Sequence, residues 1–302
     1  MKTALIPVTL VTGFLGSGKT TFLLKLAEHH PHEKIIFLVN EFARENVDGP
    51  ALMTTGRPTH SVVGGSLFCE CKAGDFVRLM RDDIASMPVS HVVIETSGIA
   101  DPSAIGRLMH DHQLDQAFEI RRIVNIVAPK RFPQLHANLA SVRAQVQACD
   151  TIIFNQTDLA SPGQIERSHR LVAAANPNAR LISGHHCEVE FDLNEVATAP
   201  ALPAEPLAKC DSNPFTSATV QFDRAVSLTR LRAAIANLPT AILRLKGRVR
   251  TSAGWREVQC TVNTTTIVPC DRGEHSQLVV IAHDRNEPTL NRIVRQLSTL
   301  QR

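Results

Sequence analysis

The sequence predicts an α/β protein, in which a doubly wound, mostly parallel sheet is followed by a smaller α+β domain. Through the first two-thirds of the chain, nearly continuous Val/Ile/Leu runs alternate with helical patterns, as they do when strands are buried on both faces of a parallel sheet. A Pro- and Ala-rich segment then interrupts this periodicity. We therefore expect one domain at 1–196, a linker at 197–214 and a second domain at 215–302.

The expected elements of the first domain alternate between strand and helix. Apolar runs predict strands at 6–12, 35–40, 89–95, 122–127, 151–155 and 179–183. Helical periodicity predicts helices at 19–29, 75–86, 133–149 and 162–175. This alternation is typical of a doubly wound α/β domain.

The second domain differs in kind. Four stretches are typical of antiparallel strands: "FTSATVQF", "AILRLKGRVR", "WREVQCTVN" and "QLVVIAHD". Helical patterns at 227–237 and 288–300 are expected to cover one face of that sheet, which gives a small α+β domain.

The charge and composition of the chain argue against several classes of protein. Its 302 residues include 32 basic and 29 acidic side chains, so the net charge is only +3, and no Lys/Arg block occurs. We therefore expect no nucleic-acid partner and no membrane partner. No apolar stretch reaches the roughly 20 residues of a membrane span, and no cleavage-site pattern follows the apolar start, so a cytoplasmic protein is expected. Its seven scattered cysteines are expected to be reduced thiols.

The turn after the first expected strand carries the motif G-x-x-x-x-G-K-[ST], in the form "GFLGSGKT" at 13–20. Its glycines let successive backbone N–H groups converge on a β-phosphate, and Lys19 supplies positive charge to the β/γ oxygens. The Thr20 hydroxyl is placed to coordinate Mg²⁺ at the positive end of the following helix. A nucleoside triphosphate is the implied ligand. The residues expected to contact it here are Gly13, Gly16, Ser17, Gly18, Lys19, Thr20 and Thr21.

Two later strand ends bear on Mg²⁺ and on the base. Glu95 closes an apolar strand, where an acid can reach the Mg²⁺ shell, and the Gly98 N–H lies where a γ-phosphate can be sensed. In "NQTD", Asn155 and Asp158 follow a later strand, and a carboxylate there can accept the N1–H and N2–H₂ donors of guanine, which adenine lacks. GTP is therefore favoured, although N-x-x-D is also common in ordinary turns.

The chain resembles the CobW family of P-loop GTPases in five stretches: "VTGFLGSGKTTFLLKL", "VNEF", "ETSGIADP", "NQTD" and "LRLKGRV". That family includes zinc-handling metallochaperones, cobalamin-pathway CobW proteins and nitrile hydratase activators. The resemblance covers nearly the whole chain, and it implies a P-loop GTPase domain followed by a CobW-type C-terminal domain. It also implies slow GTP hydrolysis coupled to the binding of a transition metal, usually zinc or cobalt, and to its delivery to a client protein.

The family's metal motif, G-G-C-x-C-C, is altered in this sequence. In the matching stretch "VVGGSLFCECKAGD", Ser66 and Phe68 replace the first two cysteines, while Cys69 matches the third. Cys69 and Cys71 still form a C-x-C pair, and two thiolates one residue apart project to the same side of an extended segment and suit a cation such as Zn²⁺. Glu41 of "VNEF" is carried over from the resemblance as an oxygen ligand. The opposing interpretation is that both cysteines are small buried side chains.

Further departures from the family bear on the nucleotide. Gln156 stands where the family's base motif has Lys, so stacking on the base should weaken and discrimination falls largely on Asp158. Ala128 stands where the family tends to end its fourth strand with Asp. Glu41 or Asp48, in the expected switch segment, could orient the attacking water.

Two histidine groups offer weaker metal ligands. His185-His186-Cys187 follows the last strand of the first domain, and His110-x-His112 lies in "LMHDHQLD". Either group could form an auxiliary metal site, but histidines in polar loops are more often solvated.

The sequence thus predicts a GTPase that couples its nucleotide state to metal binding and delivery, with Lys19, Glu41 and Glu95 as catalytic residues. The expected metal ligands are Thr20 and Glu95 for Mg²⁺, and Glu41, Cys69 and Cys71 for Zn²⁺, with Co²⁺ as an alternative. The expected partner is a client metalloprotein, and homo-oligomerisation is left open. Two alternatives stay open: a P-loop kinase that phosphorylates a small molecule, and a nucleotide-gated assembly factor in which the C-x-C pair only packs.

Overall fold

The computed structural model describes residues 5–41, 58–63, 73–98, 102–195, 216–239, 241–261, 264–273, 275–282 and 288–301. The chain divides into two compact units, Met1–Asp211 and Ser212–Arg302. The linker expected at 197–214 lies outside the described residues, so the predicted domain boundaries stay a prediction. In the described part of the chain, every helix is too short or too polar to cross a membrane.

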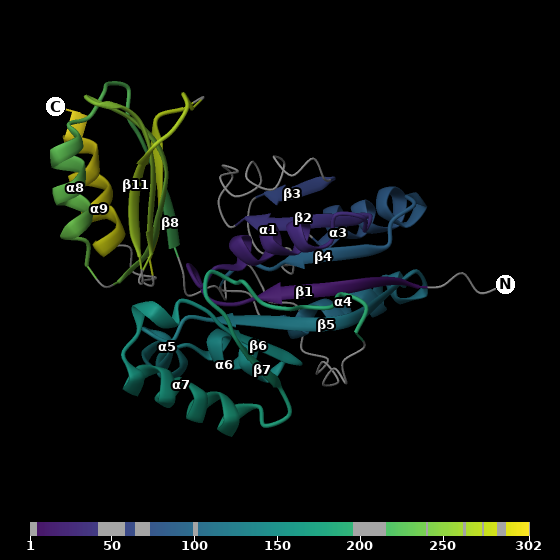
Figure 1. The fold of residues 1–302 in the computed structure, drawn as a ribbon. Coiled ribbons are helices and arrows are strands. Elements are labelled where there is room, and N and C mark those ends of the chain that lie inside the picture. Colours follow the sequence, from purple (N-terminus) through teal and green to yellow (C-terminus); the bar gives the residue numbers. More distant parts are fainter. Residues whose placement is uncertain are drawn as a thin grey trace. The chain divides into compact units, whose positions relative to one another are not determined.

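The first unit is built on a sheet that has seven strands in the described part of the chain, and every neighbouring pair is parallel. The strand order is β3-β2-β4-β1-β5-β6-β7 (Figure 1). The strands are β1 Ile6–Thr12, β2 Ile35–Glu41, β3 Thr59–Val63, β4 His91–Glu95, β5 Phe118–Val127, β6 Thr151–Phe154 and β7 Arg180–Ser183. The predicted fold class is confirmed. The turn after β1 lies at the carboxyl edge of the sheet, where open α/β sheets bind ligands.

Helices pack onto this sheet. They are α1 Lys19–His29, α3 Ala73–Arg78, α4 Ser103–Asp111, α5 Phe132–Asn138, α6 Ala140–Gln147 and α7 Pro162–Ala175. Phe22, Leu23 and Leu26 of α1 belong to one buried cluster with strand residues such as Val11 and Phe37. Helices α5, α6 and α7 gather beside β5, β6 and β7 (Figure 1). Burial of the apolar face of α1 thus fixes the helix that follows the Gly-rich turn.

The single helix expected at 133–149 is wrong, because the structure has two helices there. The backbone of Leu139 is extended, with φ −116° and ψ 117°, and its side chain is buried. The amide of Asn138 donates to the carbonyl oxygen of Gln134 and so competes with a continuing helical turn.

The helix expected at 75–86 also differs from the structure. Helix α3 is continued by a π turn at Leu79–Asp83 and a 3₁₀ turn at Ile84–Ser86. The sequence pattern does not predict β3 or α4 at all. Both are short, and β3 carries only five residues, "THSVV", with polar side chains among them.

Residues 188–195, here called the strap, cross the first unit without forming a helix or a strand. The strap places Val189, Phe191 and Leu193 in the same buried cluster as α1. The Phe191 ring meets the edge of the Phe22 ring at a centroid distance of 5.4 Å. Glu188 forms an ion pair with Lys25 of α1, with 3.0 Å between Oε2 and Nζ. The strap is therefore held against α1 by side chains rather than by backbone pairing.

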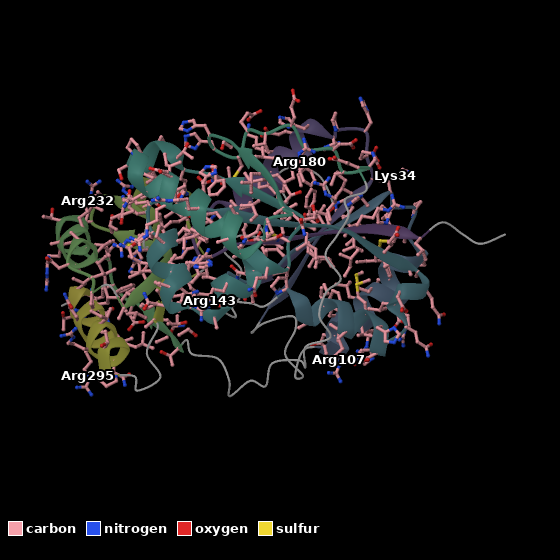
Figure 2. The ribbon with its side chains drawn as sticks, turned by 90° about the horizontal axis from the view of Figure 1, so that it is seen from below. Lys34, Arg107, Arg143, Arg180, Arg232 and Arg295 are labelled. Carbon is pink, nitrogen blue, oxygen red and sulfur yellow. The ribbon has the colours of Figure 1, made fainter. Side chains whose placement is uncertain are left out.

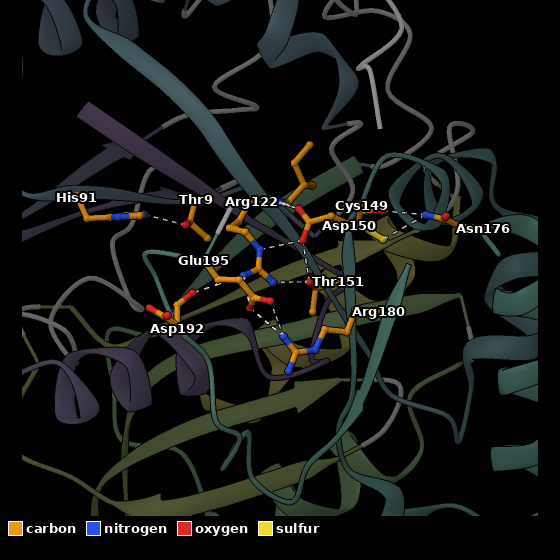
Figure 3. Close-up of polar contacts among 11 residues, drawn as sticks. Thr9, His91, Arg122, Cys149, Asp150, Thr151, Asn176, Arg180, Asp192 and Glu195 are labelled. Carbon is orange, nitrogen blue, oxygen red and sulfur yellow. Dashed lines mark hydrogen bonds and ion pairs between the residues drawn. The ribbon is translucent and has the colours of Figure 1, made fainter. Parts of the chain in front are cut away.

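A buried polar cluster fastens the strap near the amino end of β6 (Figure 3). The guanidinium of Arg122 donates through Nε to Asp150 Oδ1, at 3.0 Å, and through Nη2 to Thr151 Oγ1, at 2.7 Å. Its Nη1 donates to Glu195 Oε2 at 3.0 Å. The same guanidinium lies 4.6 Å from the ring centroid of Phe191. Because Arg122 is only 1% exposed, these contacts compensate the burial of its charge.

The second unit contains an antiparallel sheet in the order β11-β10-β9-β12-β8. Its strands are β8 Thr216–Gln221, β9 Ile242–Thr251, β10 Gly254–Thr261, β11 Thr265–Pro269 and β12 Gln277–Ala282. Helices α8 Leu228–Ala236 and α9 Pro288–Ser298 lie together on one face (Figure 1). Their Leu231, Ile293 and Leu297 share a buried cluster with Leu245 and Val280 of the sheet. The predicted α+β class is confirmed, while β11 is not predicted by the sequence.

Basic side chains are distributed over separate elements of each unit. In the first unit, Arg107, Arg143 and Arg180, labelled in Figure 2, belong to α4, α6 and β7. Arg180 begins β7, and its Nη1 lies 2.8 Å from Glu195 of the strap.

Candidate functional site

The turn between β1 and α1 needs glycine at three positions. Gly13, Gly16 and Gly18 have φ values of 135°, 78° and 110°, a backbone region that other residues rarely adopt. A Cβ on Gly13 would lie 2.4 Å from the carbonyl oxygen of Ile126, and one on Gly18 would lie 2.3 Å from Nδ2 of Asn155. The glycines therefore let the turn close against the ends of β5 and β6. We call this turn, residues 13–20, the phosphate loop.

Helix α1 begins with its amino end open toward the phosphate loop. Its N-cap is Gly18, which is left-handed and provides no side-chain cap for the first N–H groups of the helix. Lys19 is buried, and its Nζ donates to the carbonyl oxygens of Gly13, at 2.9 Å, and Phe14, at 3.5 Å. An ammonium group and a positive helix end thus meet at one loop, which is an arrangement that binds phosphate.

Thr20 and Glu95, the two predicted Mg²⁺ ligands, lie together. The Thr20 hydroxyl donates to Glu95 Oε2 at 3.4 Å. Glu95 is the last residue of β4, which pairs with β1, and its register partner is Val11. Glu95 is only 6% exposed, so its side chain reaches the loop from within the molecule. Hydroxyl and carboxylate oxygens are the ligands that Mg²⁺ uses beside substrate phosphates.

Four buried hydroxyl groups in or beside the phosphate loop have no hydrogen-bond partner among the described residues. They belong to Thr12, Ser17, Thr96 and Ser97. Buried polar groups are normally paired, so these four call for a partner that the described chain does not supply. Phosphate oxygens and the water shell of Mg²⁺ are such partners. The residues present therefore fit a nucleoside triphosphate with Mg²⁺.

The remaining predicted phosphate contacts border the same loop. Gly98 packs directly on it, because a Cβ there would lie 2.7 Å from the backbone nitrogen of Leu15. Gln145 of α6 donates to the Gly98 carbonyl oxygen at 3.4 Å. Thr21 follows Thr20 in the first turn of α1. The structure thus brings these predicted residues to one edge of the sheet.

The Asn155 side chain contacts backbone groups of two loops, and its predicted contact with the base stays a prediction. Its side chain is buried, and Nδ2 donates to the carbonyl oxygen of Ser17 at 2.8 Å. Its Oδ1 accepts from the backbone N–H of Cys187 at 3.0 Å. The amide therefore ties the phosphate loop to the turn after β7, and its contacts are with backbone at both ends.

Gln156 and Asp158 follow at the end of β6. Gln156 has a left-handed backbone, with φ 58°, and its Nε2 donates to the carbonyl oxygen of Gly16 at 3.1 Å. Asp158 lies in the 3₁₀ turn Thr157–Leu159, and its side chain is 42% exposed. Its Oδ1 lies 3.3 Å from Nδ1 of His185. Asp158 is therefore open to a ligand on this side of the phosphate loop.

The turn after β7, residues 185–188, completes this side of the site, and the sequence analysis missed it as a nucleotide-site element. Cys187 is buried, its thiol donates to the carbonyl oxygen of Gly18 at 3.4 Å, and burial raises its pKa to about 12. The turn reaches the site because β6 and β7 are parallel neighbours and the loops after such strands meet at one edge, a strand order that the sequence alone does not state.

The predicted metal ligands cannot be placed in the same way. Cys69 and Cys71 lie outside the described residues, as does Asp48, and Glu41 is described only as the last backbone residue of β2. Across the described ranges, no three His, Cys, Asp or Glu side chains are grouped as a metal site. His110 instead pairs with Asp115, with 3.1 Å between Nδ1 and Oδ2.

Two family models match the chain. The nucleotide-binding domain described as CobW/HypB/UreG matches residues 7–183. The cobalamin synthesis protein cobW C-terminal domain matches residues 215–298. Together the two matches span both compact units.

Known proteins resemble the chain over most of its length. It is 26% identical over 263 residues to zinc chaperone YjiA of Escherichia coli (strain K12), covering 80% of this chain and 81% of that protein. It is 26% identical over 289 residues to zinc chaperone CobW of Sinorhizobium sp, covering 80% of each. The crystal structure of Zn(II)-bound YjiA GTPase from E. coli has a similar fold, with a TM-score of 0.50, 21% identity, and 99% and 100% of the two chains covered. The first family model matches more than half of the residues of this chain, so the chain belongs to the CobW/HypB/UreG family and carries a CobW C-terminal domain.

Proposed function

We propose that this protein is a GTP-hydrolysing metallochaperone, which couples its nucleotide state to the binding of zinc and to the delivery of that metal to a client protein. The observation that carries the nucleotide half of the proposal is the phosphate loop with its buried Lys19 and the four unpartnered hydroxyls around it. The metal half is supported by relatives that are named zinc chaperones.

Hydrolysis is assigned to residues at the carboxyl edge of the sheet. Lys19 and the amino end of α1 bind the β- and γ-phosphate oxygens and stabilise the charge that moves between them in the transition state. Thr20 and Glu95 would hold Mg²⁺, which supplies further charge neutralisation when bound. Glu41, at the end of β2, is proposed to orient the attacking water. β2 pairs with β4, so this position is one strand away from Glu95.

Base reading is assigned to Asp158, which can accept the two donors of guanine. A carboxylate left unpaired by adenine discriminates against ATP. We propose a smaller preference for GTP than a family base motif with Lys would give, because Gln156 has a shorter stem and carries no charge. The Gln156 amide still contacts the phosphate loop, which keeps the two loops joined.

The cargo site is assigned to Glu41, the last residue of β2, and to Cys69 and Cys71, which lie in the sequence between β3 and β4. Two thiolates and a carboxylate suit Zn²⁺, and Co²⁺ is the alternative cargo. In GTPases the segment near the γ-phosphate rearranges when the nucleotide changes, so a metal site there would respond to hydrolysis. We propose a GTPase domain at 1–196 and a CobW-type domain at 215–302. A cytoplasmic location, a client metalloprotein and self-association belong to the same proposal.

The decisive experiment is an isothermal titration of Zn²⁺ into the full chain with either GDP or a non-hydrolysable GTP analogue bound. If the two sites are coupled, zinc affinity differs between the nucleotide states, typically by about 5- to 150-fold. The Cys69→Ser, Cys71→Ser double variant should lose this difference and keep GTP binding. A Cys260→Ser, Cys270→Ser variant is the matched control, because both thiols are partly exposed and lie in the second unit.

The two rival functions give different results in the same preparation. A kinase would transfer phosphate to an acceptor molecule rather than to water. A nucleotide-gated assembly factor would bind GTP with no zinc bound, and its zinc titration would be equal in the two nucleotide states. Either result would remove the metallochaperone from this proposal.

A further inference from the structure

The carboxylate proposed to read the base already has a neighbour in the protein. Nδ1 of His185 lies 3.3 Å from Oδ1 of Asp158. The two residues are 27 positions apart in the sequence, and they meet because β6 and β7 are adjacent parallel strands, with Phe154 opposite Ser183. The sequence analysis expected only "NQTD" to contact the base.

His185 is held in place by an unusual turn. The N–H of Glu188 donates to the carbonyl oxygen of His185 at 2.9 Å, which closes a four-residue turn. Its two central residues, His186 and Cys187, have φ values of 50° and 57°, a region that side-chain-bearing residues seldom occupy. Such strain persists only where the surroundings impose it, and it gathers at functional sites.

Two contacts from outside the turn impose its conformation. The Asn155 amide accepts from the N–H of Cys187, and the Cys187 thiol lies beneath Gly18 of the phosphate loop. The rings of His185 and His186 pack edge to face, with 4.3 Å between their centroids. The turn is therefore tied to the phosphate loop on one side, and it presents the His185 ring to the Asp158 carboxylate on the other.

We propose that His185 is a positioning residue that holds the Asp158 carboxylate ready for guanine and so sets the preference of this protein for GTP over ATP. This inference rests on the proposed function, in which Asp158 reads the base. An exposed carboxylate on a surface turn rotates freely unless a partner fixes it. Each of its oxygens can accept more than one hydrogen bond, so Oδ1 can keep its contact with His185 while the carboxylate accepts the N1–H and N2–H₂ donors.

The test measures the affinities of non-hydrolysable GTP and ATP analogues for the full chain and for His185→Phe, which keeps a flat ring and removes the ring nitrogen that faces Asp158. We expect GTP-analogue affinity to fall by up to about five-fold, the worth of one exposed ion pair, with ATP-analogue affinity unchanged. His185→Asn should restore the preference, because its amide nitrogen reaches the position of Nδ1. The matched control is His110→Phe, which breaks a similar exposed His–Asp pair away from the site and should change neither affinity.

A separate variant tests the function on which the inference rests. In Asp158→Asn the side chain gains a donor that matches the C2 carbonyl of xanthine, so preference should move from GTP to XTP. If that switch fails, base reading by Asp158 is wrong, and the role of His185 is lost with it. If the switch occurs but His185→Phe keeps its GTP-to-ATP ratio or raises it, only the positioning role is overturned. His185→Ala serves as the second variant should His185→Phe lower thermal stability.

Discussion

Buried polar side chains occur at both ends of the parallel sheet, but the two ends use them differently. Near the amino end of β6, the guanidinium of Arg122 has protein partners at all three of its nitrogens. At the carboxyl end of β1 and β4, the hydroxyls of Thr12, Ser17, Thr96 and Ser97 lack a partner among the described residues. Burial of a polar group therefore does not by itself mark a site. The informative feature is a buried polar group whose partner has to come from outside the chain.

His91, at the amino end of β4, lies between these two cases, because one of its ring nitrogens has a partner and the other has none among the described residues. Its Nε2 lies 2.8 Å from Thr9 Oγ1, while Nδ1 is buried with no partner in the described part of the chain. Burial, with a smaller contribution from the positive charge of Arg121, lowers the pKa of this histidine to about 4. The ring is therefore neutral at neutral pH, and an unpaired nitrogen on a neutral ring costs far less than a buried charge.

The largest effect is expected from a substitution in the Arg122 cluster, near the amino end of β6. Arg122→Ala leaves the carboxylate of Asp150 buried without its cation, and we expect the free energy of unfolding to fall by about 3–5 kcal/mol. Urea unfolding measures this loss. Arg107→Ala is the control, since its pair with Asp111 is exposed and should contribute less than about 0.5 kcal/mol. Equal losses in the two variants would contradict the structural role given to this cluster.

Lys19→Ala should inactivate the phosphate loop, which follows the carboxyl end of β1, without unfolding the protein. We expect GTP hydrolysis to fall by at least about 100- to 1000-fold, because the ammonium that faces the β/γ oxygens is removed. Phosphate release assays measure the rate, and thermal unfolding of the same samples checks the fold. Lys25→Ala is the control on the same helix, where the ammonium pairs with Glu28 and Glu188 on the surface. Hydrolysis at the normal rate in Lys19→Ala would remove the phosphate-loop assignment.

Low pH should destabilise the folded protein through His91, at the amino end of β4. Its folded pKa of about 4 lies below the ordinary value of 6.5, so the unfolded chain takes up the proton first. The stability that is present above pH 6.5 should be lost as the pH falls toward 4, by about 3 kcal/mol at that point. Urea midpoints between pH 7 and pH 4 measure this slope. His91→Gln should flatten it, and an unchanged slope would show that other groups cause the acid sensitivity.

The smallest effects give the sharpest test of the comparison, because the same substitution is made at both ends. Thr96→Val removes a buried hydroxyl that has no partner among the residues the structure describes, so we expect stability without nucleotide to rise by about 1 kcal/mol and GTP-analogue affinity to fall. Thr151→Val removes a hydroxyl that bonds Arg122 and Asp150, so stability should fall by about 1–3 kcal/mol. Thermal unfolding with and without the analogue measures both. The comparison fails if both variants shift stability in the same direction.

The sequence predicts those parts of the fold that are determined by residues close together in the chain. Strand β1, the phosphate loop and α1 follow one another in 24 residues, and the predicted ranges 6–12 and 19–29 match the structure. The break at Leu139 was missed, because helical periodicity continues through it and only its packing decides the backbone. The backbone contacts of the Asn155 side chain and the contact of His185 with Asp158 were missed for a related reason. Both depend on which strands are neighbours, and a single sequence does not state that order.

The ties that Asn155 and Cys187 make to the phosphate loop also bear on the order of folding. Asn155 and Ser17 are 138 residues apart in the sequence, and Cys187 and Gly18 are 169 apart. Contacts of such separation form late, because closing the long intervening loops costs chain entropy before any contact repays it. The phosphate loop lies near the start of the chain, yet it gains its supports only when the last strand of the sheet is in place. Nucleotide should therefore slow unfolding of the finished domain and leave its refolding rate unchanged.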